Sequence, residues 1–294
     1  MAGGHAQPRD PSLLRNLSAG GLPPDNAAYF SGNAARWYDA TYAWRTEDIG
    51  FYEALAGQWA GPGGAVLELG AGSGRITLPL ARAGFRITAV DSSADMIELL
   101  RRRLGDEPAS VVERVEPVEQ DLRRLRLDRL YRFICLPFNT LLMFSQSHER
   151  QQALDAVREH LAPSGAFAFE VFTPDPARLV TSADWEVDLE HDIEGRDGEG
   201  KVHVRREIMR GVDIGRQVMH NRFRHRVSTA DDGRELASWE DEMTLAFIFP
   251  RELDLLLERQ GFGVKARYGG PAMEPYDPTP ENVQPQYVVA QLIQ

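Results

Sequence analysis

A glycine-rich segment that begins with an acidic residue is the clearest chemical signal in the chain. It reads Glu68-Leu69-Gly70-Ala71-Gly72-Ser73-Gly74 and lies between a short apolar run and an apolar helical pattern. Glycines let a ligand approach the backbone, and a strand-turn-helix junction of an open parallel sheet is where nucleotides bind. A dinucleotide fingerprint would need glycine at position 75, where this chain has Arg75. The segment therefore predicts a nucleotide-type site with the spacing G-x-G-x-G.

Two acidic positions further along fit the same site. Asp91 ends the next predicted strand, and its carboxylate can accept hydrogen bonds from both hydroxyls of a ribose. Gln120, Asp121 and Leu122 follow the third predicted strand. There a carboxylate can accept from an adenine amino group, while a neighbouring backbone N–H reaches a ring nitrogen. The alternative for Asp121 is a loop or helix-capping role.

The elements that position these residues follow a βαβ pattern. Strand-like apolar runs alternate with helical patterns, and two final strands follow a last helix. The runs lie at 65–69, 86–90, 110–118, 133–136, 166–172, 263–268 and 286–293, and the helical patterns at 76–83, 96–104, 148–161 and 250–260. This alternation is typical of a parallel sheet covered on both faces. We therefore expect an α/β fold, a Rossmann-like seven-stranded, mostly parallel sheet with helices on both faces.

The pattern changes after the fifth predicted strand. Polar and apolar residues alternate at 185–194, 201–211, 216–228 and 235–249. Such alternation predicts an inserted antiparallel β-sheet. We accordingly expect a flexible N-terminal arm at 1–28, and a core with an N-terminal helical lid at 29–176 and 250–294. The insert at 177–249 is expected to form the roof of a substrate (acceptor) pocket and a possible dimer interface.

Together these features resemble the class I S-adenosylmethionine-dependent methyltransferases over roughly residues 29–294. The resemblance includes the Tyr38-Asp39 pair and Pro137-Phe138-Asn139-Thr140 after the fourth strand. It implies S-adenosylmethionine as the cofactor and S-adenosylhomocysteine as the product. The cofactor-binding residues that it implies are Tyr29, Tyr38, Glu68, Gly70, Ala71, Gly72, Gly74, Asp91, Ser92, Met96, Gln120, Asp121, Leu122, Leu136 and Phe138.

Within that superfamily the chain is similar to small-molecule N-methyltransferases of natural-product pathways that act on amino sugars or glycopeptides. Several of these carry a histidine a few residues after the fourth-strand loop, where this chain has Met143. The departure argues against a histidine general base. Proximity and orientation of the reactants are therefore expected to account for most of the lowering of the activation barrier. Nitrogen and oxygen both stay open as the acceptor atom, with nitrogen slightly favoured. Tyr38 and Asn139 are the catalytic candidates, and the acceptor candidates are Asn139, Met143, Arg222 and Trp239.

Charged side chains of the insert offer two further interpretations. Arg222, Arg224 and Arg226 share one face of a predicted strand and could grip an anionic acceptor. Pairing with the acids at 240–242 of the next strand is the favoured alternative. The other candidate bases are His148, His191, His203, His220 and His225, for which solvated or surface roles are favoured.

Composition limits the remaining classes. The 294 residues carry a net charge of -11, which argues against a general nucleic-acid binder. With Cys135 as the one cysteine, no internal disulfide or cysteine-based zinc cluster can form, and no metal is expected. No apolar run predicts a membrane segment or signal peptide, so a cytoplasmic protein is expected. The expected partners are a small-molecule acceptor and a second copy of the chain. The competing classes are a nicotinamide-dependent oxidoreductase and an inactive cofactor-binding partner subunit.

Overall fold

The computed structural model describes residues 26–42, 44–179, 185–195, 200–279 and 282–293. The chain divides into two compact units. One comprises Asn26–Pro174 and Ala246–Gln294, and the other comprises Met1–Asp25 and Asp175–Leu245. The arm predicted at 1–28 falls almost entirely outside the described residues.

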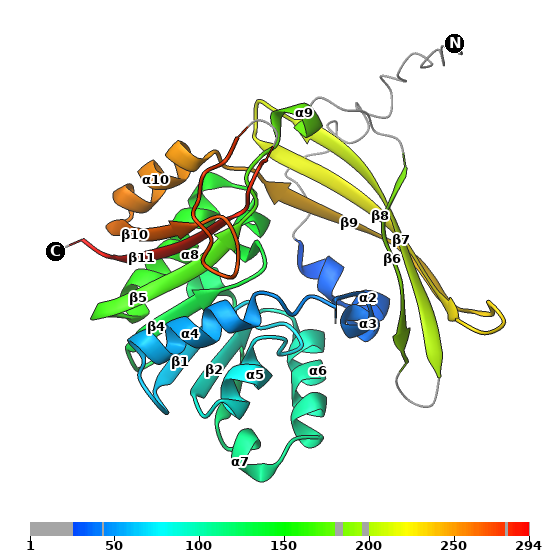
Figure 1. Cartoon of the computed structure of the whole chain (residues 1–294), viewed down its shortest axis with the longest axis horizontal. Coiled ribbons are helices and arrows are strands. Elements are labelled where there is room, and N and C mark those ends of the chain that lie inside the picture. The colour runs from blue at the N-terminus through cyan, green and yellow to red at the C-terminus, as the bar shows by residue number, and fades with distance from the viewer. Residues whose placement is uncertain (1–25, 43, 180–184, 196–199, 280–281, 294) are drawn as a thin grey trace. The chain divides into compact units, whose positions relative to one another are not determined.

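The larger unit contains a seven-stranded sheet with the order β10-β11-β5-β4-β1-β2-β3 (Figure 1). Its strands are β1 (Ala65–Leu69), β2 (Arg86–Asp91), β3 (Val115–Glu119), β4 (Tyr131–Leu136), β5 (Leu161–Val171), β10 (Phe262–Tyr268) and β11 (Gln286–Leu292). The first five strands pair in parallel, whereas β11 runs antiparallel to both β5 and β10. The predicted fold class is confirmed. Because the strand order reverses between β1 and β4, the carboxyl ends of these two strands form the switch point where ligands of such sheets bind.

Helices cover both faces of this sheet. The helices of the larger unit are η1 (Asn26–Phe30), α2 (Gly32–Arg36), α3 (Tyr38–Tyr42), α4 (Ile49–Trp59), α5 (Thr77–Arg82), α6 (Ala94–Gly105), α7 (Ala109–Val112), η2 (Leu122–Arg124), η3 (Thr140–Met143), α8 (Ser147–His160) and α10 (Pro250–Arg259). The helix α9 (Pro176–Leu179) belongs to the smaller unit. Neighbouring strand residues point to opposite faces, so Leu67 packs in the apolar cluster of α8 and α10, whereas Val66 packs in that of α4, α5 and α6. These two clusters make the sheet a rigid platform for the loops at its carboxyl edge.

The prediction for the third strand was wrong in its first half. A strand was expected at 110–118, but the chain forms the short helix α7 there and β3 begins only at Val115. Pro108 stands at the N-cap of α7 with φ -57, which suits the start of a helical turn, and Val111 is buried. The lead-in at 34–59 also forms three short helices, with a break between Tyr42 and Ile49, where two were expected.

The smaller unit contains a four-stranded antiparallel sheet with the order β6-β7-β8-β9. Its strands are β6 (Glu186–Glu194), β7 (Lys201–Asp213), β8 (Val218–Thr229) and β9 (Glu235–Ala246). On β8 the arginine side chains lie on the exposed face and pair with acids. Arg222 and Arg224 meet Glu242 and Glu240 at 2.6 and 2.7 Å, as predicted, whereas Arg226 pairs with Glu235 at 3.5 Å and not with residues 240–242. These ion pairs neutralise the three arginines. They therefore argue against the interpretation that the arginines bind an anionic acceptor.

Candidate cofactor and active site

The glycine loop turns sharply between β1 and α5. Gly70, Gly72 and Gly74 all have positive φ, at 69°, 54° and 86°. The Ala71 N–H donates to the Val90 carbonyl at 3.0 Å, which ties the loop to the end of β2. A Cβ on Gly72 would lie 3.8 Å from the Tyr38 Oη, so the loop backbone is open on this side up to that tyrosine. The loop thus presents bare backbone at the switch point.

Asp91 links the glycine loop to the end of β2. Its Oδ2 accepts from the Gly72 N–H at 2.8 Å and its Oδ1 from the Ser93 N–H at 2.9 Å. Burial raises the pKa of this carboxyl, and backbone N–H groups of Ser93, Gly72 and Ser92 oppose the rise. Each carboxylate oxygen has capacity for further hydrogen bonds. Asp91 is therefore fixed by the backbone and can still receive a diol.

Glu68 is the other acid of the motif and lies at the end of β1. Its carboxylate is buried and accepts from the Thr77 hydroxyl at 2.5 Å. Burial raises the pKa of Glu68 to about 8. The group is therefore largely protonated at neutral pH, and a nearby cation would favour its ionisation.

Aromatic side chains from the N-terminal helices lie against the glycine loop and the loop after β4. The Tyr38 and Tyr42 ring centroids are 4.8 Å apart, and Tyr42 meets Phe138 edge-on at 5.2 Å. The Tyr29 and Tyr42 hydroxyls are 2.9 Å apart. Burial raises the pKa of Tyr38, so this phenol stays neutral. Tyr38 and Tyr29 thus join one aromatic cluster beside the loop.

Hydrogen bonds connect the N-terminal helices to the glycine loop and to the segment after β2. The Ser93 hydroxyl donates to the Phe30 carbonyl at 2.7 Å, and the Gly32 N–H donates to Asp95 at 2.9 Å. On the glycine loop, the Ser73 hydroxyl donates to Asp39 at 2.5 Å. Residues 26–42 are thereby fixed over the carboxyl ends of β1 and β2.

The loop after β4 has an unusual backbone. Phe138 and Asn139 both lie in the left-handed region, with φ 61° and 57°. Asparagine tolerates this region, whereas for phenylalanine it is a strained conformation of the kind found at functional sites. The Asn139 Oδ1 accepts from the Phe172 N–H at 2.7 Å, so this catalytic candidate also joins the ends of β4 and β5. Leu136 is buried in the core, and the Met143 carbonyl accepts from Asn26 at 2.9 Å.

The residues expected at an adenine edge lie around the ends of β2 and β3. Met96 is fully buried in α6, and Leu122 is buried at the start of η2. Asp121 caps η2 and binds the Arg123 guanidinium at 2.7 Å. Burial alone would raise the pKa of Asp121, but its hydrogen bonds with Arg123 outweigh this and lower it. The Gln120 side chain accepts from the Arg126 N–H at 3.0 Å, so it braces this turn.

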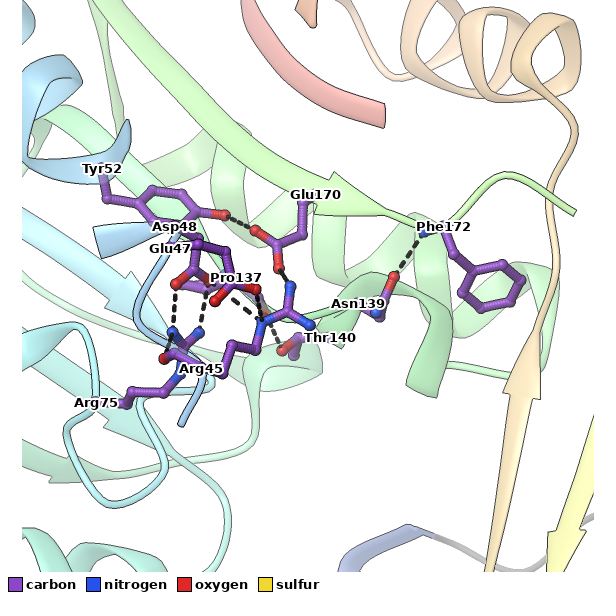
Figure 2. A network of polar contacts seen from close by, with 10 residues as sticks. All are labelled: Arg45, Glu47, Asp48, Tyr52, Arg75, Pro137, Asn139, Thr140, Glu170 and Phe172. Carbon is purple, nitrogen blue, oxygen red and sulfur yellow. Dashed lines mark hydrogen bonds and ion pairs between the residues drawn. The ribbon is translucent and has the colours of Figure 1, made fainter. Parts of the chain in front are cut away.

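The larger unit contains a buried network of charges that the sequence did not predict. Figure 2 shows Arg45, Asp48, Arg75 and Glu170 linked by hydrogen bonds and ion pairs, with Tyr52 donating to Glu170 at 2.8 Å. Arg45 meets Glu170 at 2.5 Å, and Arg75 holds both Asp48 oxygens, one of them at 2.7 Å. From the sequence, Arg75 is significant only as the residue that replaces the third glycine of a dinucleotide fingerprint. Its position directly after the glycine motif is the one local signal of another role.

The candidates on β8 and β9 belong to the smaller unit. Arg222 pairs with Glu242. Trp239 stacks on His225 with ring centroids 4.5 Å apart and donates to Asp241 at 2.5 Å. Burial lowers the pKa of His225 to about 3, so this imidazole is neutral. Of the other histidines, His203 contacts Asp192 and Glu190, and His220 contacts Thr244.

Adding a methyl group at Gly70 tests the contact between the glycine loop and the loop after β4. We expect Gly70→Ala to destabilise the protein more than Gly72→Ala. Both residues carry the cost of a positive φ, about 1–2 kcal/mol for alanine, but only the Gly70 Cβ would meet Thr140 atoms, at 2.8 and 3.0 Å. Thermal unfolding of both variants measures the difference. Thr140→Ala should recover part of the loss in the Gly70→Ala background, and equal melting temperatures for the two glycine variants would contradict the expectation.

The sequence and the fold of this chain are similar to those of known methyltransferases. A family model described as a methyltransferase domain matches residues 66–165. Cypemycin N-terminal methyltransferase from a Streptomyces species is 32% identical over 112 residues, which cover 38% of this chain and 43% of that protein. The CcbJ methyltransferase from Streptomyces caelestis superposes with a TM-score of 0.68 at 24% identity, covering 92% of this chain and 91% of that one. The glycopeptide N-methyltransferase MtfA, solved with S-adenosyl-L-methionine, superposes with a TM-score of 0.52 at 22% identity, covering 83% and 94%.

These likenesses agree on one fold. Residues 66–165 match the model of a methyltransferase domain, and the chain shares its fold with the solved methyltransferases. The matched range contains the glycine loop, Asp91, Asp121 and Asn139. The chain spans about half the length of the curated relatives it matches. No described helix has the length and apolar character needed to span a membrane.

Proposed function

We propose that this protein transfers a methyl group from S-adenosylmethionine to a small-molecule acceptor, releasing S-adenosylhomocysteine. The observation that carries the proposal is the arrangement of the glycine loop and Asp91 at the switch point of a methyltransferase domain. S-Adenosylmethionine supplies a methyl group already activated on a sulfonium. The chain then has to bind the donor, exclude water and orient the acceptor, which can lower the barrier by about 7–11 kcal/mol.

The residues of the site fit this donor. Asp91 offers a fixed carboxylate for the ribose diol, and Gly72 lets the ligand approach the backbone. The buried side chains of Met96 and Leu122 would line the apolar side of an adenine site, with Asp121 at its edge. Glu68 offers a protonatable carboxylate to the amino group of the methionine moiety. Tyr38 would cover the donor, as expected for a residue that excludes water.

Nitrogen is the favoured acceptor atom. A neutral amine needs no general base, whereas an oxygen acceptor usually does. In the described part of the larger unit the histidines are His148, which is exposed at the start of α8, and His160, which accepts from the Leu127 N–H at 3.0 Å. Neither is suited to take a proton from an acceptor. The names of two similar proteins, an N-terminal methyltransferase and a glycopeptide N-methyltransferase, support the same choice and a role in natural-product biosynthesis.

The insert between β5 and α10 is the proposed source of acceptor specificity and of a dimer interface. It follows β5 directly along the chain and forms a compact unit of its own. Arg222 and Trp239 stay the acceptor-contacting candidates of this insert. Analytical ultracentrifugation of the full chain would measure the oligomeric state, and a monomer would contradict the dimer.

Calorimetric titration tests the proposed function against its competitors. We expect S-adenosylmethionine and S-adenosylhomocysteine to bind and NAD not to bind. Binding of NAD without a response to the sulfonium donor would favour the oxidoreductase. Mass spectrometry of candidate amine acceptors incubated with labelled donor should reveal a methylated product, and its consistent absence would favour an inactive partner subunit.

Donor binding should release a proton from Glu68. Because the pKa of Glu68 is raised to about 8, the free protein holds this proton at pH 7. An ammonium group beside the carboxyl would lower that pKa, so up to about one proton should be released at pH 7. Calorimetry in buffers of different ionisation enthalpy measures the release. Glu68→Gln is the matched control and should abolish the buffer dependence, whereas a wild-type heat independent of the buffer would contradict the assignment.

A further inference from the structure

Four charged side chains from three segments meet inside the larger unit. Asp48 is fully buried, Glu170 is 2% exposed, and Arg45 and Arg75 are 17% and 13% exposed. Arg45 and Asp48 lie just before α4, with Asp48 as its N-cap. Arg75 follows the glycine loop, and Glu170 lies near the end of β5 (Figure 2). The network therefore connects the N-terminal helices, the glycine loop and the sheet.

Stability alone does not account for such a network. The desolvation of buried charges roughly cancels their attraction, and apolar replacements of a whole buried pair are often neutral or stabilising. Arg45 illustrates the balance, since burial lowers its pKa while Glu170 and Asp48 raise it, with a net rise. What the charges do provide is a fixed geometry, because each arginine has specific carboxylate partners.

That geometry acts on Phe138. The Arg45 guanidinium carbon lies 4.4 Å from the centroid of the Phe138 ring, and that of Arg75 lies 5.5 Å from it. Both distances are within cation–π range. The strained φ of Phe138 needs support from its surroundings. The two arginines contact its ring, and the neighbouring Asn139 accepts a hydrogen bond from the Phe172 N–H just after β5.

The support extends through Phe138 to the glycine loop. The ring contacts Tyr42, Tyr42 contacts Tyr38, and Tyr38 lies against Gly72. The guanidinium of Arg75 also donates to the Arg45 carbonyl at 3.0 Å, so the same residue fixes the backbone that leads into α4. A change in the network would thus move the aromatic cluster.

We propose that Arg45, Asp48, Arg75 and Glu170 are positioning residues that hold Phe138 and the aromatic cluster in the geometry that binds the methyl donor. This inference rests on the proposed function, since it takes the glycine loop and Phe138 as parts of a donor site. None of the four residues has to contact the donor. Their effect on binding is indirect, through the loop after β4.

A pair of variants separates positioning from stability. Glu170→Gln removes the carboxylate nearest to the buried Arg45 and leaves it only the more distant acids Glu47 and Asp48, so it should lower both the melting temperature and the affinity for S-adenosylhomocysteine. The double variant Arg45→Gln/Glu170→Gln removes both charges, so its melting temperature should return towards wild type. Its affinity should stay about fivefold weaker, because the nearer of the two cations over Phe138 is missing. Arg45→Lys, which keeps a cation beside Glu170 and the ring, should retain most of the affinity.

The measurements are calorimetry with S-adenosylhomocysteine and thermal unfolding of the full chain without ligand. Arg102→Gln is the control, because Arg102 pairs with Glu98 at 3.3 Å on the exposed face of α6. It should change neither quantity. The positioning role would be overturned if the double variant bound S-adenosylhomocysteine as tightly as wild type, whether or not Glu170→Gln alone had weakened the binding. A wild-type protein that does not bind S-adenosylhomocysteine would instead refute the proposed function.

Discussion

Asp91→Ala should weaken the binding of S-adenosylhomocysteine by about 1.5–3 kcal/mol, the contribution of hydrogen bonds to a charged group. The loss has two sources. The ribose diol loses its acceptor, and the Gly72 and Ser93 N–H groups lose the oxygens that fix them at 2.8 and 2.9 Å. The second source makes the upper end of the range the expected result.

Asp91→Asn distinguishes these two sources. An asparagine keeps the size and one acceptor oxygen, but its amide NH₂ would face one of the two backbone N–H donors. We therefore expect Asp91→Asn to weaken binding nearly as much as alanine does while changing the melting temperature less. Titration calorimetry with S-adenosylhomocysteine and thermal unfolding give both quantities. Wild-type affinity in either variant would show that the ribose does not bind at Asp91.

The geometry proposed for the donor site rests on signals that are local in the sequence. The glycine loop and Asp91 lie at consecutive strand ends, and parallel strands bring their carboxyl ends to one edge whatever the rest of the chain does. The pairing of Arg222 and Arg224 with acids on β9 was predictable for a similar reason, since alternation along a strand places side chains on a known face. These predictions needed only the periodicity of strands and helices.

The charge network could not be predicted, because its members come together only in the tertiary structure. Arg45 and Glu170 are far apart in sequence, and each has an ordinary local interpretation. Asp48 is the clearest case. An aspartate directly before a helix suggests a capping residue, yet the Asp48 side chain caps no N–H of α4 and binds Arg75 instead. Similarly, nothing in the sequence around Asn139 indicates that its side-chain oxygen accepts from the Phe172 N–H just after β5.

Asp48→Ala should be among the most destabilising single substitutions in the larger unit, at about 3–5 kcal/mol of unfolding free energy, because it leaves a buried guanidinium without its carboxylate. Asp48 is fully buried, and Arg75 contacts both of its oxygens. The Arg45 Nε lies 3.7 Å from the same carboxylate, so two cations lose a neighbour. Denaturant unfolding measures the free energy.

The loss should depend on the unpaired charge more than on the lost contact. The double variant Asp48→Ala/Arg75→Met removes the charge and should recover a large part of the stability. Arg102→Ala breaks the exposed pair with Glu98, whose side chains are 72% and 53% exposed, and should cost less than about 1 kcal/mol. If Asp48→Ala cost no more than this control, or if the double variant were as unstable as the single one, an unpaired buried charge would not be the source of the loss. Because Arg75 directly follows the glycine loop, recovered stability without recovered donor affinity would also separate the two roles of this arginine.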